Sequence, residues 1–173
     1  MLKAAHDGHS LFDLVDKSHR HEYQVPEFQR DLVWRPEQVR ELLVSLVQGH
    51  YAGALLMLKL DPNLILEFDP NTPPFAHREI YGAPPLPSPA TSTLAYSVLD
   101  GQQRISAVYY AFQHPNLPLP PSSKKRPYRF FLRLDKFFRV LLDLDPRDVK
   151  KEGVPCGKIV STPFTILTQR PAR

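Results

Sequence analysis

The sequence contains little cysteine and glycine and no long apolar run, and each absence excludes a class of protein. Its single cysteine, Cys156, cannot form an internal disulfide, which excludes a small secreted scaffold held by disulfides. No apolar stretch approaches the roughly 20 residues of a membrane-spanning helix, and residues 1–10 lack the apolar core of a secretory signal. We therefore expect a cytoplasmic protein with no membrane partner.

The length of the chain limits the number of domains, and its charge limits the classes of partner. A sequence of 173 residues suits a single domain, and a hydrophobic fraction of 42% is enough to form its core. The net charge of +4 is compatible with nucleotide or nucleic-acid partners but does not identify one.

Proline is abundant and glycine is scarce: the sequence has nineteen prolines and seven glycines. Eight of the prolines lie between residues 61 and 93, so this segment cannot form a packed helix or a central strand. We interpret it as an insertion that holds one strand near residues 64–68. The predicted core then covers about residues 10–145, followed by an irregular tail over residues 146–173.

Hydrophobic periodicity and breaker residues predict short strands and helices in the core. A helix begins at Pro36, carries apolar residues at helical spacing from Val39 to Val47, and stops at Gly49. We interpret residues 26–34 as an ordered loop, and the apolar run 52–60 as a strand covered on both faces. The other predicted elements are a helix capped by Ser10, strands at 22–25, 96–99 and 128–134, a helix at 105–112, and a helix or strand at 137–144.

The junction from Asp100 to Arg104 is the strongest candidate site, because a strand ends there and a helix begins. Gly101 permits a tight turn, and the first backbone amides of the helix would be available to an anion. Arg104 adds a cation suited to phosphate oxygens, and Asp100 can hold a hydrated magnesium ion. Gln102 or Gln103 can position an attacking water. The alternative is an ordinary capped helix with solvated polar residues.

A second candidate cluster lies in the loop 26–34. We expect Phe28 and Trp34 to anchor this loop in the core, leaving Gln29 and Arg30 outward, with Arg30 as a second cation for the same pocket. The alternative for Arg30 is an ion pair with Glu27 or Asp31.

A basic run is the third candidate. Aromatic residues are interleaved with it, so a nucleic-acid surface is one interpretation, and a strand with one solvated face is the other. Its residues are Lys124, Lys125, Arg126 and Arg129.

Two segments together resemble the N-terminal domain of GmrSD-type restriction endonucleases. Residues 23–34, Tyr-Gln-Val-Pro-Glu-Phe-Gln-Arg-Asp-Leu-Val-Trp, with the predicted helix that follows, resemble the opening of that domain. Residues 98–107, which contain Asp-Gly-Gln-Gln-Arg, resemble its DGQQR signature. The resemblance covers about residues 10–145 without the proline-rich insertion.

That family is similar in fold to the ParB N-terminal domain and sulfiredoxin, which implies an α+β class with a small mixed sheet and packed helices. The resemblance also implies binding and hydrolysis of a nucleoside triphosphate, GTP or another, with Mg²⁺. In phage-defence restriction systems this activity regulates or powers cleavage of modified DNA. The expected catalytic residues are Asp100, Gln102, Gln103 and Arg104, and the expected nucleotide-binding residues are Gln29, Arg30, Gly101 and Arg104.

Relatives usually carry a second domain with a His-Asn-His nuclease motif, and this sequence has no such motif. We therefore expect contact with DNA to run through a partner nuclease subunit or domain, and self-association is compatible with the sequence. Two alternatives stay open: a non-catalytic, ParB-like nucleotide- or DNA-binding regulatory module, and a degenerate fragment.

Overall fold

The computed structural model describes residues 10–60, 76–86, 94–120, 126–134 and 164–168. By their contacts these residues divide into two compact units. Unit 1 draws on residues 1–33 and 53–117, and unit 2 draws on residues 34–52 and 118–173.

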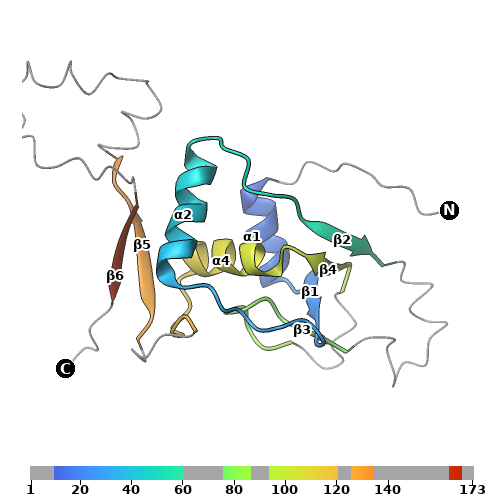
Figure 1. Cartoon of the computed structure of the whole chain (residues 1–173). Helices are drawn as coiled ribbons and strands as arrows, with labels where there is room; N and C mark the ends of the chain where they lie inside the picture. The colour runs from blue at the N-terminus through green and yellow to red at the C-terminus, as the bar shows by residue number, and fades with distance from the viewer. Residues whose placement is uncertain (1–9, 61–75, 87–93, 121–125, 135–163, 169–173) are drawn as a thin grey trace, which may run out of the picture. The chain divides into compact units, whose positions relative to one another are not determined.

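Unit 1 is built on a four-stranded mixed sheet (Figure 1). The strands lie in the order β2-β4-β1-β3; β1 and β4 run parallel, and the other neighbours are antiparallel. With its helices this sheet confirms the predicted α+β class. The strands are β1 (Tyr23–Pro26), β2 (Leu56–Lys59), β3 (His77–Arg78) and β4 (Tyr96–Asp100), and the helices are α1 (Leu11–His19) and α4 (Gln102–Gln113).

The parallel pairing of β1 with β4 decides where the two loops meet. Tyr23 lies opposite Tyr96, and Gln24 lies opposite Ser97. Because parallel strands have their carboxyl ends at the same edge of a sheet, the loop after β1 and the turn after β4 leave the sheet side by side. These are the two segments that the sequence singled out.

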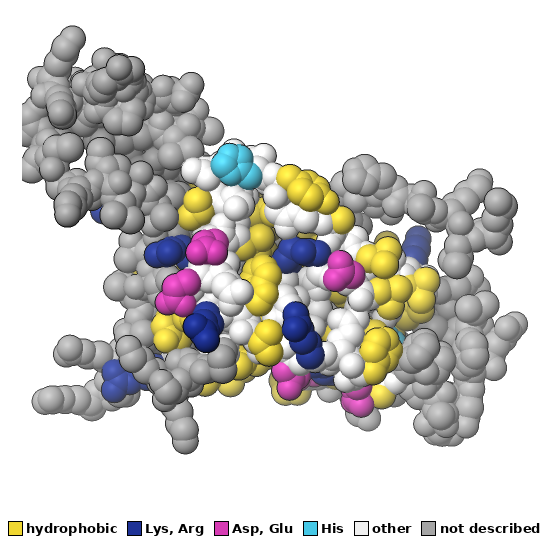
Figure 2. All heavy atoms as spheres, in the orientation of Figure 1, with side chains coloured by type: hydrophobic (Ala, Val, Ile, Leu, Met, Phe, Trp, Pro, Cys, Tyr) yellow, Lys and Arg dark blue, Asp and Glu magenta, His cyan; other side chains and the backbone are white. Residues whose placement is uncertain are grey.

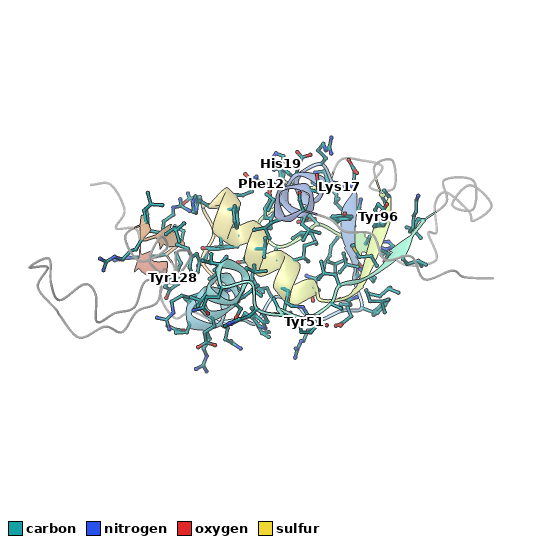
Figure 3. All side chains as sticks on the ribbon, turned by 90° about the horizontal axis from the view of Figure 1, so that it is seen from above. Phe12, Lys17, His19, Tyr51, Tyr96 and Tyr128 are labelled. Atoms are coloured by element: carbon teal, nitrogen blue, oxygen red, sulfur yellow. The ribbon has the colours of Figure 1, made fainter. Side chains whose placement is uncertain are left out.

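Helix α1 packs against α4 and β1. It begins where predicted, at a capping box. The Ser10 hydroxyl accepts a hydrogen bond from the Asp13 backbone amide, and the Asp13 carboxylate accepts one from the Ser10 backbone amide. Its Lys17 ammonium lies 5.8 Å from the ring centre of Tyr23 and 5.7 Å from that of Tyr96. Figure 3 shows Lys17 on the side of α1 that faces the strand carrying Tyr96. This cation–π contact ties the helix to both parallel strands.

Helix α4 supplies much of the core of unit 1. Ile105, Tyr109 and Tyr110 are almost fully buried. The hydroxyl of Tyr110 donates to the Leu117 carbonyl at 2.6 Å, and the hydroxyl of Tyr109 lies 2.9 Å from Nδ1 of His19. The polar ends of both buried rings are therefore paired, as buried hydroxyls require.

Unit 2 contains α2 (Pro36–Val47) and an antiparallel pair formed by β5 (Tyr128–Leu132) and β6 (Phe164–Thr168). The helix lies against β6. Its bounds agree with the prediction, and it buries Val39, Leu42 and Leu43 from the predicted apolar face.

Three expectations about strands differ from the structure. The run 52–60 forms only the short strand β2, which is an edge strand with half-exposed side chains, so covering on both faces was wrong. Strand β3 was not expected inside the proline-rich segment, and β6 was not expected in the tail. Neither the strand expected at 64–68 nor the element expected at 137–144 falls within the described residues.

The start of α4 depends on Gly101, whose φ is 89°. We expect Gly101→Ala to lower the free energy of unfolding by about 2 kcal/mol, because it adds left-handed strain and because the new Cβ crowds the Leu55 side chain and stands 3.3 Å from the Ala54 carbonyl oxygen. Gly49→Ala is the matched control: φ there is +68° with nothing within 4 Å of a Cβ, so we expect strain alone, about 1 kcal/mol. Chemical denaturation of both variants measures the difference, and equal losses would contradict the role of the contact.

Candidate functional site

Two glutamine side chains join the loop after β1 to the turn after β4. The amide nitrogen of Gln29 donates to the carbonyl of Val98 at 2.6 Å and to that of Leu99 at 3.1 Å. The side chain of Gln103 accepts from the Val33 amide and donates to the Asp31 carbonyl, both at 2.9 Å. The loop is therefore held at both ends, once by its own glutamine and once by a glutamine of α4.

Arg78, on edge strand β3, holds the same loop from the other side. Its guanidinium forms an ion pair with the Asp31 carboxylate. It also donates to the carbonyls of Gln29 at 2.9 Å and Arg30 at 3.0 Å. One planar side chain with several donors can make these three contacts together. Arg78 has no signal in the sequence, because the pairing of β3 with β1, which brings it here, leaves no pattern in a proline-rich segment.

Arg104 lies at the opposite side of the turn, against the start of β2. Its Nη2 donates to the Ala54 carbonyl at 2.5 Å and is 3.5 Å from Oδ2 of Asp100. A Cβ at Gly53 would stand 2.9 Å from Nη1 of Arg104, and one at Gly101 would stand 3.3 Å from Nη2. Both glycines leave room for the guanidinium beside the helix start.

The turn has the electrostatic features of an anion site. Within the described part of the chain, no side chain caps the N-terminus of α4, whose first amides carry the positive end of the helix dipole. The Nε of Arg104 is buried and has no hydrogen-bond partner among the described residues. The Nε atoms of Arg40 and Arg78 are buried without a described partner in the same way, so it is the place of the Arg104 guanidinium beside Gly101 and the α4 N-terminus that favours an anion there.

Tyr81 lies near the loop end of this network. Burial raises the pKa of its hydroxyl above the ordinary value, and the negative charge of Asp31 raises it further. Tyr81 is therefore a neutral hydrogen-bonding group at neutral pH.

The structure brings most of the predicted residues together. Gln29, Gln103, Asp100, Gly101 and Arg104 lie in one network, while Arg30 is exposed on the same loop and Gln102 is buried. Arg126 and Arg129 belong to unit 2, and Lys124 and Lys125 lie outside the described residues.

The anchoring role expected of Phe28 was wrong. Its side chain is 71% exposed, and Trp34 is only half-buried. The loop is anchored by polar contacts instead, through the Gln29 amide and the Arg78 guanidinium. Backbone carbonyls at a strand end need hydrogen-bond donors. The Gln29 amide and the Arg78 guanidinium provide these donors, which a phenyl ring could not.

The fit of a magnesium ion rests on Asp100. Its carboxylate is 75% exposed, and its closest described cation is Arg104. Among the described residues no group of three His, Cys, Asp or Glu side chains forms a metal cage. One exposed carboxylate suits an ion that takes its remaining ligands from water and phosphate, as Mg²⁺ usually does.

The fold and the network define an α+β domain whose two polar motifs meet at one edge of a mixed sheet. The model of the GmrSD restriction endonuclease N-terminal domain matches residues 11–161, and the chain belongs to this family. It is also 38% identical over 136 residues to an uncharacterized protein of Methanocaldococcus jannaschii, covering 78% of this chain and 22% of that relative. The chain thus spans about a fifth of the length of the curated relative that it matches. In the described part of the chain, no helix is both long and apolar enough to cross a membrane.

We expect Arg78→Lys to loosen the loop 27–33, because an ammonium cannot replace three planar contacts. The free energy of unfolding should fall by about 1–3 kcal/mol, and trypsin should cut after the exposed Arg30 more quickly. Arg20→Lys is the control, since Arg20 is an exposed α1 arginine with ion pairs to Asp16 and Glu22 that contribute little. Unchanged unfolding and cleavage in Arg78→Lys would show that Arg78 does not hold the loop.

Proposed function

We propose that this domain binds and hydrolyses a nucleoside triphosphate, GTP or another, with Mg²⁺, in a restriction system that defends against phage by acting on modified DNA. The observation that carries the proposal is the convergence of the uncapped α4 N-terminus and the Arg104 guanidinium with its buried, unpartnered Nε. Membership of the GmrSD N-terminal domain family supports it.

The phosphates of the nucleotide are proposed to lie at the α4 N-terminus. There the amides of Gln102 to Arg104 and the Arg104 guanidinium offset their charge. The exposed Arg30 adds a second cation from the loop that Gln29 and Arg78 hold in place. Asp100 would hold Mg²⁺ through its exposed carboxylate, and that ion would neutralise charge on the phosphates.

Hydrolysis needs a water held in line with the phosphate that is transferred. The Gln103 amide already bonds to Val33 and Asp31 of the loop. We therefore assign loop positioning to Gln103. Gln102 is buried, with its Oε1 3.4 Å from Nε2 of Gln103, so the water that we propose it positions would lie at that buried amide. Arg104 is proposed to offset the charge that develops on the phosphate oxygens.

The place of this activity in a larger system is part of the same proposal. The chain matches about a fifth of its longer relative, so we propose that DNA cleavage comes from a nuclease domain or subunit outside residues 1–173. Nucleotide binding would then regulate or power that cleavage in the cytoplasm.

Arg104→Ala tests the nucleotide site. A ligand that binds only the folded state raises its stability by about 2.7 kcal/mol at a hundredfold excess over Kd, so we expect the wild-type Tm to rise with at least one NTP and Mg²⁺. The rise and phosphate release should both be lost in Arg104→Ala, while the control Arg20→Ala on α1 should keep both. A folded wild-type protein that neither shifts in Tm nor releases phosphate with any of the four NTPs would refute the proposal.

A second candidate function, a DNA-binding module, is favoured by the exposed face of β5. Phe130 is buried, whereas Phe131, on the opposite face of the strand, is half-exposed. Arg129 and Arg133 flank Phe131 two residues away on either side, so this face alternates basic and aromatic side chains. Such a face suits a single strand, whose phosphates contact the arginines and whose base stacks on the ring.

We expect Phe131→Ala and Arg133→Glu each to weaken binding of a labelled single-stranded oligonucleotide, measured by fluorescence anisotropy, by about fivefold or more. The wild-type affinity should also fall steeply with salt. Phe12→Ala removes from α1 a phenyl ring that is even more accessible than that of Phe131, and Lys59→Glu makes the same charge change on the exposed strand β2. If these controls weaken binding as much as the β5 variants do, the β5 face is not the site.

A further inference from the structure

Residues next to the polar turn from Asp100 to Arg104 carry large apolar side chains that reach solvent, and we call these side chains the apolar border. Phe28 is 71% exposed, Leu56 59%, Val33 44% and Leu99 41%. Side chains with exposed fractions this large contribute little to the core. Apolar side chains that gather at the surface beside a polar site are typical of a binding surface.

Hydrogen bonds and strand register place these four residues next to the turn in the backbone. Phe28 precedes Gln29, whose amide bonds to the Leu99 carbonyl, and the Val33 amide bonds to Gln103. Leu56 is the register partner of Asp100 across the β2–β4 pair. Each apolar residue therefore lies within one residue of the site network. Figure 2 shows hydrophobic side chains gathered over β2, with basic and acidic side chains beside them.

The apolar border suits the flat apolar end of a ligand, and the turn beside it suits an anionic end of the same ligand. We propose that Phe28, with Leu56 and Leu99, forms the subsite for the nucleobase, while the α4 N-terminus holds the phosphates. This inference rests on the proposed function, and it assigns the base to a ring that is largely exposed.

The size of the border favours a base over a protein partner. Four partly exposed side chains offer on the order of 400 Å², about half of the roughly 800 Å² that each side of a stable protein interface buries. A base needs much less area, and the charged groups of Asp100 and Arg104 within the same border would have to be desolvated by an apolar protein segment. A nucleotide places its base on the apolar side chains and its phosphates beside the charged groups, so no apolar segment has to desolvate those charges.

Stacking on a phenyl ring contributes affinity without reading the edge of the base. The effect of Phe28 should therefore be similar for all four NTPs, and any preference among bases must come from other groups. The inference thus predicts a loss of affinity that is shared by the nucleotides and absent for a ligand without a base.

The test compares each NTP with inorganic tripolyphosphate, both with Mg²⁺, by isothermal titration calorimetry of the full chain. Phe28→Ala should raise the Kd of the NTPs about tenfold and leave that of tripolyphosphate unchanged, and Phe28→Tyr should restore NTP affinity. Phe12→Ala is the control, because Phe12 is 75% exposed on α1 and should affect neither ligand.

The contrary results are distinct. Equal loss of both ligands in Phe28→Ala would show that Phe28 acts on the loop and overturn the base subsite. Unchanged NTP affinity in that variant would also overturn it and leave a protein segment as the occupant of the border. Wild-type protein that binds tripolyphosphate as tightly as NTPs would refute the base subsite alone. Wild-type protein that binds neither ligand would refute the proposed function together with it.

Discussion

The parallel pairing of β1 with β4 is the constraint on which the candidate site depends. The two strands are far apart in sequence, and their register brings both carboxyl ends to one edge. The loop after β1 and the turn after β4 then lie close enough for side chains of one to bond the backbone of the other. Lys17, placed over Tyr23 and Tyr96, strengthens this pairing from the helix side.

Polar residues that suggest catalysis from their sequence have mostly architectural contacts in this structure. Gln29 and Gln103 use their side-chain amides on backbone groups of the opposite segment. Arg78, which the sequence did not point to, uses its guanidinium on the same loop. Backbone groups at strand ends and in loops need partners, and long polar side chains reach them. Arg104 donates to the Ala54 carbonyl in the same way, and its buried Nε, like that of Arg78, has no partner among the described residues. The Asp100–Arg104 motif thus supplies residues that build the turn and residues that are proposed to act on a ligand.

Local features were predictable from the sequence because their causes are local. Ser10 with Asp13, Pro36, and Gly101 each act within one helical turn, and the helices begin beside them as predicted. The apolar face of α2 needed only helical spacing. The exposure of β2, the pairing of β3 and the solvent-facing Phe28 depend on partners distant in sequence, and for these features the sequence was misleading or silent.

From the sequence one could predict where the helices start and that Asp100 to Arg104 forms a strand-to-helix turn. Both features follow from neighbouring residues, through backbone conformation, capping and periodicity. The family resemblance rests on the residues of the two segments 23–34 and 98–107. Tertiary structure alone decided that Arg78 holds the loop, that Gln103 bonds to the loop 31–33, and that apolar side chains border the turn. The physical reason is that strand order and register set which distant groups meet, and no short stretch of sequence encodes either.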